Sequence, residues 1–455
     1  MSTKERGSFT GKLGFVLAAA GSAVGLGNIW RFPYLAAEYG GGIFLLVYII
    51  LALTFGFSLM FAEIAIGRKT GLSSVGAFKA LNKKFAFLGY LESIVPIIIL
   101  PYYCVIGGWV IKYFSVFVSG NASLAVPEYF GQFVSLPAEP LFWFAVYLGL
   151  TALVVLCGVE KGIEKVSKIM MPVLIVLSII ISIYGITLPG AMEGVKYYLL
   201  PDFTKFSVKT VLAAMGQLFY SMSLAMGIMI TYGSYMRKDV RIDSSVKQIE
   251  IFDTGIAFIA GLMVIPAVFA SASATGTDVE TLLVSGPGLM FKTLPSVFNQ
   301  MPGGVVIGSI FFLLVIFAAL TSSISLMEAV VSIIHDKFHI GRKVSLVATL
   351  IISILLGVPS SLGNGAWSHI TILGMDFLTF FDFITNSVIM PIVALLTCIF
   401  IGYILKPKAI IEEAETNGKF KSKVLFTVVI KYFAPICIVL ILVSSVLSAF
   451  GIITI

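Results

Sequence analysis

The first strongly apolar segment of the chain contains small and polar residues that an unbroken membrane helix would not carry. Residues 21–28 read Gly-Ser-Ala-Val-Gly-Leu-Gly-Asn, and Arg31 and Pro33 follow closely. Backbone inside hydrocarbon must satisfy its own polar groups, and amide or charged side chains are tolerated there when they face protein, water or bound ions. These residues predict a helix that is broken at bilayer depth and turns backbone dipoles toward a ligand.

The sixth apolar segment has a second interruption, rich in small and hydroxyl residues, between Gly216 and Gly227. A broken helix leaves free N–H groups on one half and free carbonyl groups on the other. Two neighbouring breaks therefore offer an anion site beside cation sites, which suits an amino acid carboxylate bound together with Na⁺.

Hydroxyl groups in the eighth apolar segment add oxygen donors. Thr321, Ser322 and Ser323 follow Ala318 at the spacing of one helical turn. Taken alone, such hydroxyls in membrane helices usually hydrogen-bond backbone or allow close packing. Together with the two breaks they favour a Na⁺ site.

The composition excludes a soluble multi-domain protein. Of 455 residues, 58% are hydrophobic and 12% are charged, and the mean hydropathy is +1.04, as expected for a polytopic helical bundle. The net charge of +7 lies in short loops between apolar segments, which indicates membrane topology rather than nucleic-acid binding. The four cysteines and three histidines lack disulfide or metal-site spacing, and no catalytic constellation indicates an enzyme.

Eleven segments are long enough to cross a membrane. Lysines and arginines in alternate loops predict a multi-pass protein of the plasma (inner) membrane with a cytoplasmic N-terminus and an extracellular C-terminus. The two broken segments are five spans apart, which is typical of inverted repeats with a binding site between them. The spans are predicted at 11–37, 41–67, 87–118, 140–157, 163–187, 208–236, 243–273, 303–335, 343–358, 372–405 and 423–450.

This pattern divides the chain into four parts. We expect a cytoplasmic N-terminal segment at 1–10, a first repeat at 11–187, a second repeat at 208–405 and an accessory span at 423–450.

Three stretches resemble the neurotransmitter:sodium symporter family. They are residues 21–34 (Gly-Ser-Ala-Val-Gly-Leu-Gly-Asn-Ile-Trp-Arg-Phe-Pro-Tyr), Gly-Gly-Gly at 40–42 and Ile-Thr-Tyr-Gly-Ser-Tyr at 230–235, and the similarity runs from about Arg6 into the tenth span. Short termini and eleven spans resemble the bacterial amino acid transporters of this family. The resemblance implies an all-α membrane protein with the leucine-transporter-type fold, a five-plus-five inverted repeat and broken helices 1 and 6.

The resemblance implies a secondary transporter that moves amino acids or related amines with Na⁺ by alternating access. The alternative from another class is a sodium-dependent amino acid sensor that kept the pocket and does not translocate. Apart from the amino acid and the lipid bilayer, the sequence indicates no nucleic-acid or obligatory protein partner.

Two sodium sites are implied by the resemblance. The substrate carboxylate would be a further ligand of the first site. The first site is implied at the Ala23 carbonyl, Asn28, Ser221 and Asp253. The second is implied at the carbonyls of Gly21, Val24 and Ala318 and the hydroxyls of Thr321 and Ser322.

The resemblance also implies which residues contact the substrate. Tyr103 is expected to hydrogen-bond its carboxylate, and Tyr220 is expected to roof the pocket. The implied substrate residues are Ser22, Ala23, Leu26, Gly27, Ile99, Tyr103, Tyr220, Ser221, Ser223, Met226, Ser322 and Leu326.

Candidate gates follow from the same resemblance. The outer gate is implied at Arg31 with Asp382, and Asp376 is a close competitor for the acidic role. Gly162 and Pro172 bracket a stretch of the fifth span that would unwind locally toward the second sodium site. The inner-gate candidates are Arg6, Ser234, Tyr235 and Asp336.

Structural alternatives stay open for several of these residues. Arg31 could extend its charge to the membrane surface, Gly162 and Pro172 could form a simple cap and kink, and the aromatic and apolar pocket residues could be ordinary packing groups. Asp253 could be a neutral side chain that hydrogen-bonds between helices.

The chain departs from the family pattern at three positions. Asp253 stands where an amide is common, whereas Ala257, one turn further, stands where many bacterial relatives have a glutamate. We therefore expect Asp253 to be a built-in anion that makes transport independent of chloride, and its protonation after Na⁺ leaves would let the empty carrier return. Ala225 replaces a glycine expected in the second break and limits the length of side chain accepted. The apolar residues Ile99, Met226 and Leu326 favour a neutral, hydrophobic L-amino acid.

Overall fold

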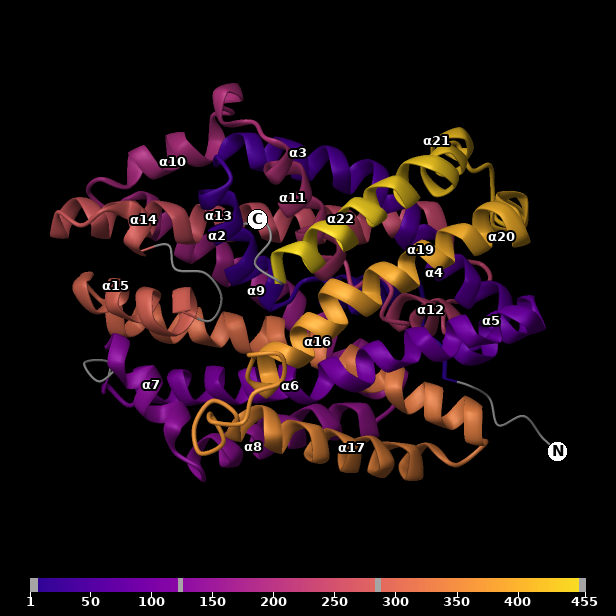
Figure 1. The fold of residues 1–455 in the computed structure, drawn as a ribbon, viewed down its shortest axis with the longest axis horizontal. Coiled ribbons are helices and arrows are strands. Elements are labelled where there is room, and N and C mark those ends of the chain that lie inside the picture. The colour runs from indigo at the N-terminus through magenta and orange to yellow at the C-terminus, as the bar shows by residue number, and fades with distance from the viewer. Residues whose placement is uncertain (1–6, 122–125, 283–287, 450–455) are drawn as a thin grey trace.

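The computed structural model describes residues 7–121, 126–282 and 288–449, which form a bundle of long helices running side by side (Figure 1). Nine helices of this part of the chain are long and apolar enough to cross a membrane, and a bent pair makes a tenth span. Within the same ranges there is no β-strand, and only two isolated β-bridges occur.

The first span is broken, as predicted. It consists of α1 (Lys12–Ala23), a π-helical turn (Gly27–Arg31) and α2 (Phe32–Glu38). The two halves are bent by 54°. Pro33 closely follows the π-helical turn and has no backbone N–H to donate to it.

The sixth span is broken as well. It consists of α11 (Val208–Ser221) and α12 (Ile228–Ser234), and the residues between them, 222–227, are not helical. The Ser207 hydroxyl caps α11 by accepting the Thr210 N–H at 3.2 Å. Gly227 precedes α12 with a φ of +70°, a left-handed conformation that glycine adopts without steric cost.

The other spans of the first half are continuous, although some contain π-helical turns. The second span joins α3 (Gly42–Leu51) to α4 (Phe57–Thr70), the third is α6 (Ala86–Val118), the fourth is α8 (Glu139–Leu156), and the fifth is a π-helical turn (Val159–Glu164) followed by α9 (Lys165–Ile186). Shorter helices join them: α5 (Ser74–Leu81), α7 (Pro127–Ser135) and α10 (Ala191–Leu199).

The second half follows the same plan. Its spans are α13 (Ile242–Thr275), α16 (Gly304–Phe338), α17 (Arg342–Leu362), α18 (Phe377–Asp382) continued by α19 (Met390–Ile399), and α21 (Lys423–Val428) continued by α22 (Ala434–Ala449). Shorter helices are α14 (Val279–Leu282), α15 (Leu294–Gln300) and α20 (Pro407–Glu415). The tenth span begins at Phe377 rather than at the predicted 372, because Ile372 and Met375 pair in a tight turn.

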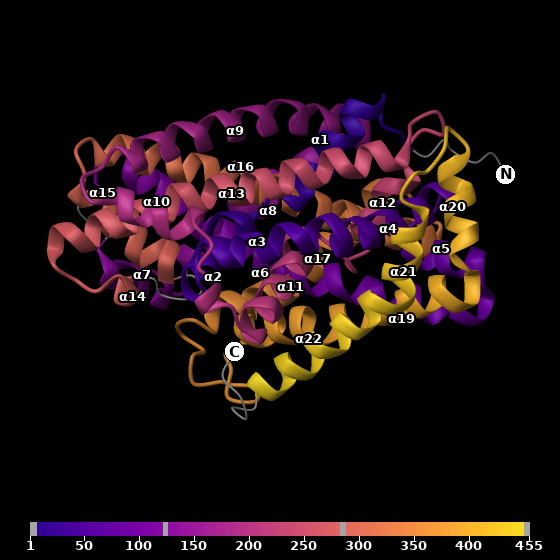
Figure 2. The same ribbon diagram turned by 90° about the horizontal axis from the view of Figure 1, so that it is seen from above.

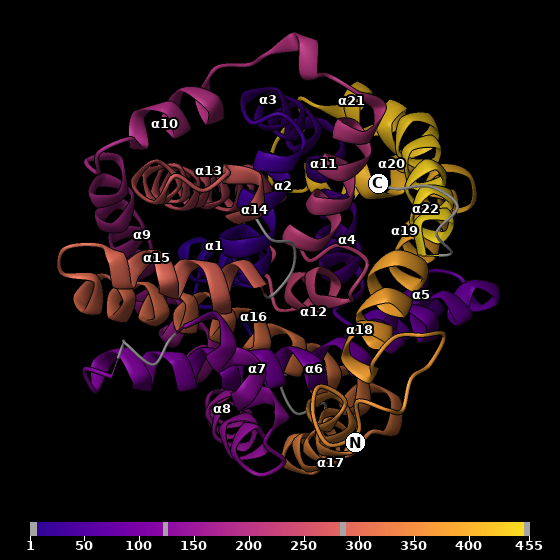
Figure 3. The same cartoon turned by 60° about the vertical axis from the view of Figure 1, so that its left-hand side comes forward.

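The broken helices lie inside the bundle. α1 packs against α9, α13 and α16, and α12 packs against α4. Seen nearly along the bundle, α1 and α12 are surrounded by α8, α9, α17, α19 and α22 (Figure 3). This placement removes the exposed backbone of both breaks from lipid, as the membrane requires.

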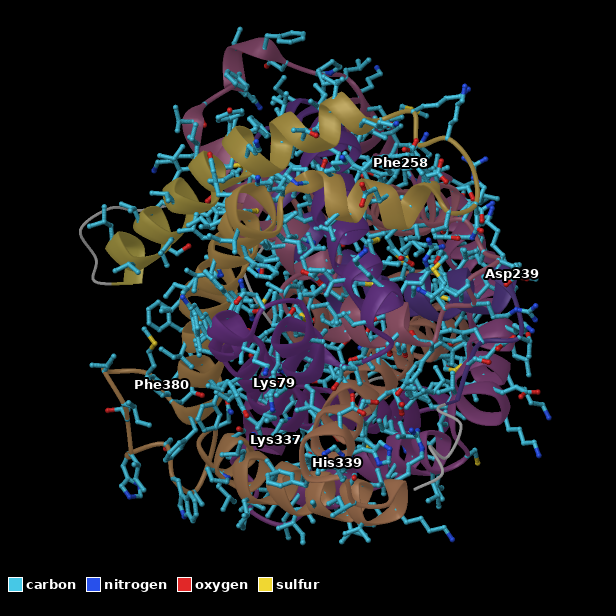
Figure 4. The ribbon with its side chains drawn as sticks, turned by 90° about the vertical axis from the view of Figure 1, so that its right-hand side faces the viewer. Lys79, Asp239, Phe258, Lys337, His339 and Phe380 are labelled. Carbon is cyan, nitrogen blue, oxygen red and sulfur yellow. The ribbon has the colours of Figure 1, made fainter. Side chains whose placement is uncertain are left out.

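The two ends of the bundle carry different short helices. α7, α14 and α15 cover one end, and α5 and α20 cover the other (Figure 2). Figure 4 faces the end with α5, where Lys79, Asp239, Lys337 and His339 are labelled. The orientation of these ends across the membrane and the division into two inverted repeats stay predictions.

Candidate functional site

Backbone N–H groups of the first break donate hydrogen bonds to side chains inside the bundle. The Gly25 N–H donates to Asn28 Oδ1 at 3.1 Å, and the Leu26 N–H donates to the Tyr103 hydroxyl at 3.3 Å. Gly25 must be small, because a Cβ there would lie 2.6 Å from Ser322 Oγ. The break therefore brings α6 and α16 into direct contact with the first span.

The second break is strained and reaches the first. Ser223 and Ala225 have φ angles of +53° and +57°, which non-glycine residues rarely adopt. The Ser223 hydroxyl donates to the Ser22 carbonyl at 3.0 Å. The two breaks, about 200 residues apart in sequence, thus meet at Ser22 and Ser223.

The residues of the first predicted sodium site converge around one carboxylate. Asp253 Oδ1 accepts hydrogen bonds from Asn28 Nδ2 and Ser221 Oγ, each at 2.8 Å. Tyr48, which the sequence analysis missed, donates to Asp253 Oδ2 at 3.4 Å. Ala23 lines the adjacent cavity. This cluster of oxygen-bearing groups is fully buried and fits a monovalent cation beside an anionic ligand.

The residues of the second predicted site converge on Ser322. Its hydroxyl lies 3.5 Å from the Gly21 carbonyl, 3.4 Å from the Val24 carbonyl and 3.2 Å from the Ala318 carbonyl. Thr321 Oγ1 also contacts the Ala318 carbonyl at 3.0 Å. Several carbonyl oxygens and two hydroxyls thus share one small volume, which is the donor set that unwound helices offer to Na⁺.

A cavity of about 30 Å³ lies between the two breaks. It has no charged side chain among its lining residues, and Gly25 and Ile228 extend the predicted set. The structure brings all twelve predicted substrate residues to this cavity: Ser22, Ala23, Leu26, Gly27, Ile99, Tyr103, Tyr220, Ser221, Ser223, Met226, Ser322 and Leu326.

A larger cavity of about 500 Å³ lies on the other side of Tyr220, whose ring borders both. Arg31 and Asp382 line it. The Arg31 guanidinium lies over the Tyr220 ring, 5.2 Å from its centroid. Both predicted outer-gate residues are described, and no ion pair within 4.0 Å joins them.

Asp382 is held by neighbours instead. Its Oδ1 accepts hydrogen bonds from the Tyr102 hydroxyl at 3.1 Å and from Asn386 Nδ2 at 2.6 Å. Asp376, the competing candidate, caps α18 by accepting the Thr379 N–H at 3.1 Å. Of the two aspartates, Asp382 therefore lines the cavity, whereas Asp376 caps the helix that follows it.

The inner-gate candidates that the structure describes contact several different partners. The Tyr235 hydroxyl donates to Glu328 Oε1 at 2.7 Å, and Arg342 forms an ion pair with the same glutamate. Asp336 accepts the N–H of Ser73 at 2.8 Å and its hydroxyl at 2.6 Å. Arg6 lies outside the described residues.

Ser234 has a local partner, since its hydroxyl donates to the Thr231 carbonyl at 2.5 Å. The N-terminal segment is attached nearby, because the Phe9 N–H donates to the Tyr235 carbonyl at 3.1 Å. Tyr235 therefore connects the N-terminal segment to α16.

Comparisons with known proteins now decide the family. The model of the sodium:neurotransmitter symporter family matches residues 6–126 and 136–452. The chain belongs to this family. The crystal structure of MhsT in complex with L-phenylalanine has a TM-score of 0.87 to this structure and 38% sequence identity, covering 97% of this chain and all (100%) of that one.

Sequence relatives within the symporter family extend this finding. An uncharacterized sodium-dependent transporter of Bacillus subtilis, YhdH, is 34% identical over 450 residues, which cover 97% of this chain and 98% of the relative. The human sodium- and chloride-dependent GABA transporter 2 is 27% identical over 406 residues, covering 78% and 67%.

Family membership identifies this symporter as a sodium-dependent membrane transporter and not an enzyme. The predicted fold class is confirmed, because this all-helical bundle, in which the first and sixth spans are broken, matches the MhsT structure over 97% of the chain. The roles of individual site residues stay predictions, although the structure brings most of them together.

Glu63 and Glu92 are residues of this symporter that the sequence analysis missed. They bind the N–H groups of Ala225 and Gly227 in the second break. The available signal was their charge within apolar spans, which marks a residue that must find a partner.

The fifth span shows why Gly162 is required. Gly162 lies in the π-helical turn before α9, and a Cβ there would lie 2.1 Å from the Val154 carbonyl. Glu164 in the same turn accepts the Thr10 N–H at 2.8 Å. The start of the fifth span is therefore tied to the N-terminal segment, and its proposed unwinding stays a prediction.

Proposed function

We propose that this symporter imports a neutral, hydrophobic L-amino acid together with two Na⁺ by alternating access, without chloride. The observation that carries the proposal is the uncharged cavity between the two helix breaks, with buried oxygen groups on two sides of it. The transported amino acid would lie in this cavity after it widens, with both sodium ions in contact with the first break.

The two sodium ions would differ in their ligands. The first would bind the Ala23 carbonyl, Asn28, Ser221, Asp253 and the substrate carboxylate, which couples its binding directly to the substrate. The second would bind the Gly21, Val24 and Ala318 carbonyls with Thr321 and Ser322, and so would join α1 to α16. Each Na⁺ that moves inward gains about 2.3 kcal/mol per 100 mV of membrane potential.

The cavity wall supports a hydrophobic substrate. Ile99, Met226 and Leu326 present apolar side chains, whereas Tyr103 lies at the first break, where it would bind the carboxylate. MhsT was crystallised with L-phenylalanine, which supports an amino acid of this class. Methionine side chains adapt their shape, so aromatic substrates are compatible with Met226.

Asp253 supports chloride independence. It would supply a negative charge beside the first sodium site, and Asn28, Ser221 and Tyr48 all donate to it. A buried pair of cations needs compensating negative charge, and the substrate carboxylate with Asp253 would provide two such charges.

Alternating access would use the contacts at both ends of the cavity. On the outer side, Arg31 would approach Asp382 over Tyr220 after substrate binds. On the inner side, loss of Na⁺ from the second site would release the Tyr235 and Glu328 contact and open a path to the cytoplasm. Binding energy shared between Na⁺ and substrate links the two events.

Uptake into proteoliposomes tests the proposal. We expect radiolabelled leucine or phenylalanine to accumulate in an inward Na⁺ gradient, to stop when choline replaces Na⁺, and to continue when gluconate replaces chloride. Binding of the same amino acids without flux would instead support the sensor alternative, and dependence on chloride would contradict the role of Asp253.

A further inference from the structure

Two buried glutamates lie beside the second helix break. Glu63 of α4 accepts the Ala225 N–H at 2.7 Å, and Glu92 of α6 accepts the Gly227 N–H at 3.2 Å. The two residues are 3% and 1% exposed. Neither lines the substrate cavity or the outer cavity, so the proposed transport cycle assigns them no role.

Each carboxylate uses only one of its oxygens. Glu63 Oε2 and Glu92 Oε2 are buried and have no hydrogen-bond partner within 3.5 Å among the described residues, and the Ser74 hydroxyl lies beside the Glu92 carboxyl group. Buried polar atoms in native proteins nearly always have a partner. The two unpartnered carboxyl oxygens, one from α4 and one from α6, therefore indicate a ligand shared between the glutamates.

These groups are neighbours. The charge of Glu92 acts on Glu63. A Cβ on Gly227 would lie 2.5 Å from Ser74 Oγ and 3.8 Å from Glu92 Cδ. The hydroxyl, the Glu92 carboxyl group and the second break thus meet at Gly227, with Glu63 close by.

Charge decides which ligand fits. Two neighbouring ionised carboxylates inside a membrane protein repel each other and are poorly solvated. Within the described ranges neither glutamate forms an ion pair with a lysine or arginine. The Cys398 thiol of α19 is a further titratable group close to Glu63. Among the described residues, no lysine or arginine within 4.0 Å therefore stabilises two anions at this place.

We propose that Glu63 and Glu92 share one proton and clamp the second helix break while they hold it. The protonated carboxyl group donates to the unpartnered oxygen of the ionised one, as in other close carboxyl pairs. When the proton leaves to water, two negative charges face each other and the carboxyl groups separate. Their N–H partners flank Met226, which lines the cavity, so loss of the proton alters the substrate site.

Infrared spectroscopy of the full-length protein in lipid bilayers tests the shared proton. At neutral pH we expect the carbonyl stretch of a buried, protonated carboxyl group, and we expect Glu63→Gln and Glu92→Gln each to abolish it. Each amide would donate permanently to the remaining carboxylate, which would then be ionised. A spectrum without this band, or a band lost in only one variant, overturns the proposal.

The pH dependence of sodium-dependent substrate binding provides a second readout. We expect the wild type to lose affinity at alkaline pH and Glu92→Gln to keep it, because the amide donor cannot be lost. Glu92→Leu removes the acceptor of the Gly227 N–H, so its affinity should be about tenfold lower at every pH. A Glu92→Gln variant with the wild-type profile contradicts the clamp.

Glu412→Gln is the matched control. Glu412 is exposed and lies 3.8 Å from Lys408, so this variant should keep the wild-type profile. The binding readout rests on the proposed function, whereas the infrared readout does not. A protein that binds no amino acid would therefore fail the binding readout, and the infrared readout would be unaffected.

Discussion

The two helix breaks satisfy their exposed backbone in different ways. In the first break, Asn28 and Tyr103 accept backbone N–H groups, and both are also proposed ligands of sodium or substrate. In the second break, the acceptors are Glu63 and Glu92, which lie outside the cavity. The first break can therefore rearrange with its ligands, whereas the second is anchored to the surrounding helices.

The backbone conformations differ in the same sense. No residue from Gly21 to Asn28 has a positive φ, whereas Ser223, Ala225 and Gly227 all do. A left-handed conformation costs a non-glycine residue about 1–2 kcal/mol. The second break is the more strained of the two, which explains why it needs partners on two neighbouring helices.

Replacing Asp253 should have the largest effect on transport, because Asp253 binds Asn28 of the first break and Ser221 at the second. We expect Asp253→Asn to abolish sodium-dependent uptake in chloride-free medium or to weaken Na⁺ binding by 10–100-fold, since it removes a proposed ligand and the built-in charge. Partial recovery on addition of chloride would support the charge argument. Uptake equal to the wild type without chloride would disprove it, and Asp239→Asn, in an exposed turn, is the control.

Ser322 and its neighbour Ser323 separate sodium binding at the first break from packing. Ser322 contacts carbonyls of the first span, whereas the Ser323 hydroxyl contacts Tyr147 and Thr151 of α8. We expect Ser322→Ala to lower the apparent Na⁺ affinity about tenfold and Ser323→Ala to lower stability by about 1 kcal/mol with unchanged Na⁺ affinity. Sodium titrations of uptake measure the first effect, and thermal unfolding in detergent measures the second. Equal Na⁺ affinities in the two variants would exclude Ser322 as a ligand.

Ala225 tests the strain of the second break. Ala225→Gly removes the Cβ from a residue with a φ of +57°, so we expect a gain of about 1 kcal/mol in the free energy of unfolding. The same change should improve competition by larger aromatic amino acids, because Met226 next to it would move more freely. The matched change Ala23→Gly, in the first break, should bring no gain in stability. A stabilised Ala23→Gly variant would contradict the proposed difference between the breaks.

Asp376 gives the smallest expected effect and separates capping from gating. Asp376→Asn keeps a side chain that can cap α18, so we expect stability to change by about 0.5 kcal/mol or less and uptake to remain. Asp382→Asn should lower uptake several-fold, since it removes the negative charge that would meet Arg31. Initial uptake rates compare the two, and a larger loss for Asp376→Asn would exchange their proposed roles.

Much of the fold was predictable from the sequence. Long apolar segments must cross the membrane as helices, and the small and polar residues at 21–28 and 216–227 are incompatible with continuous ones. The start of the tenth span was less predictable. Hydropathy does not reveal that Ile372 and Met375 pair in a turn or that Asp376 caps the helix.

The residues of the candidate site were implied by the family resemblance, and residue type alone was informative where it restricts the backbone. Gly25 and Gly162 occupy positions where a Cβ would meet a neighbouring atom at 2.6 Å and 2.1 Å, so their spacing carried information on packing. The choice of charged partners was not predictable in this way. Glu328 binds Tyr235 and Arg342, whereas the predicted inner-gate residue Asp336 binds Ser73.

The sequence by itself determined that the chain is a membrane bundle with two broken helices, because hydrocarbon imposes a rule on every residue that enters it. Only the tertiary structure decided which groups satisfy the breaks and whether Arg31 and Asp382 form an ion pair. A buried polar group must find a hydrogen-bond partner, yet the residue type does not indicate which group that partner is. That choice depends on distances between residues far apart in the chain, such as Glu63 and Ala225.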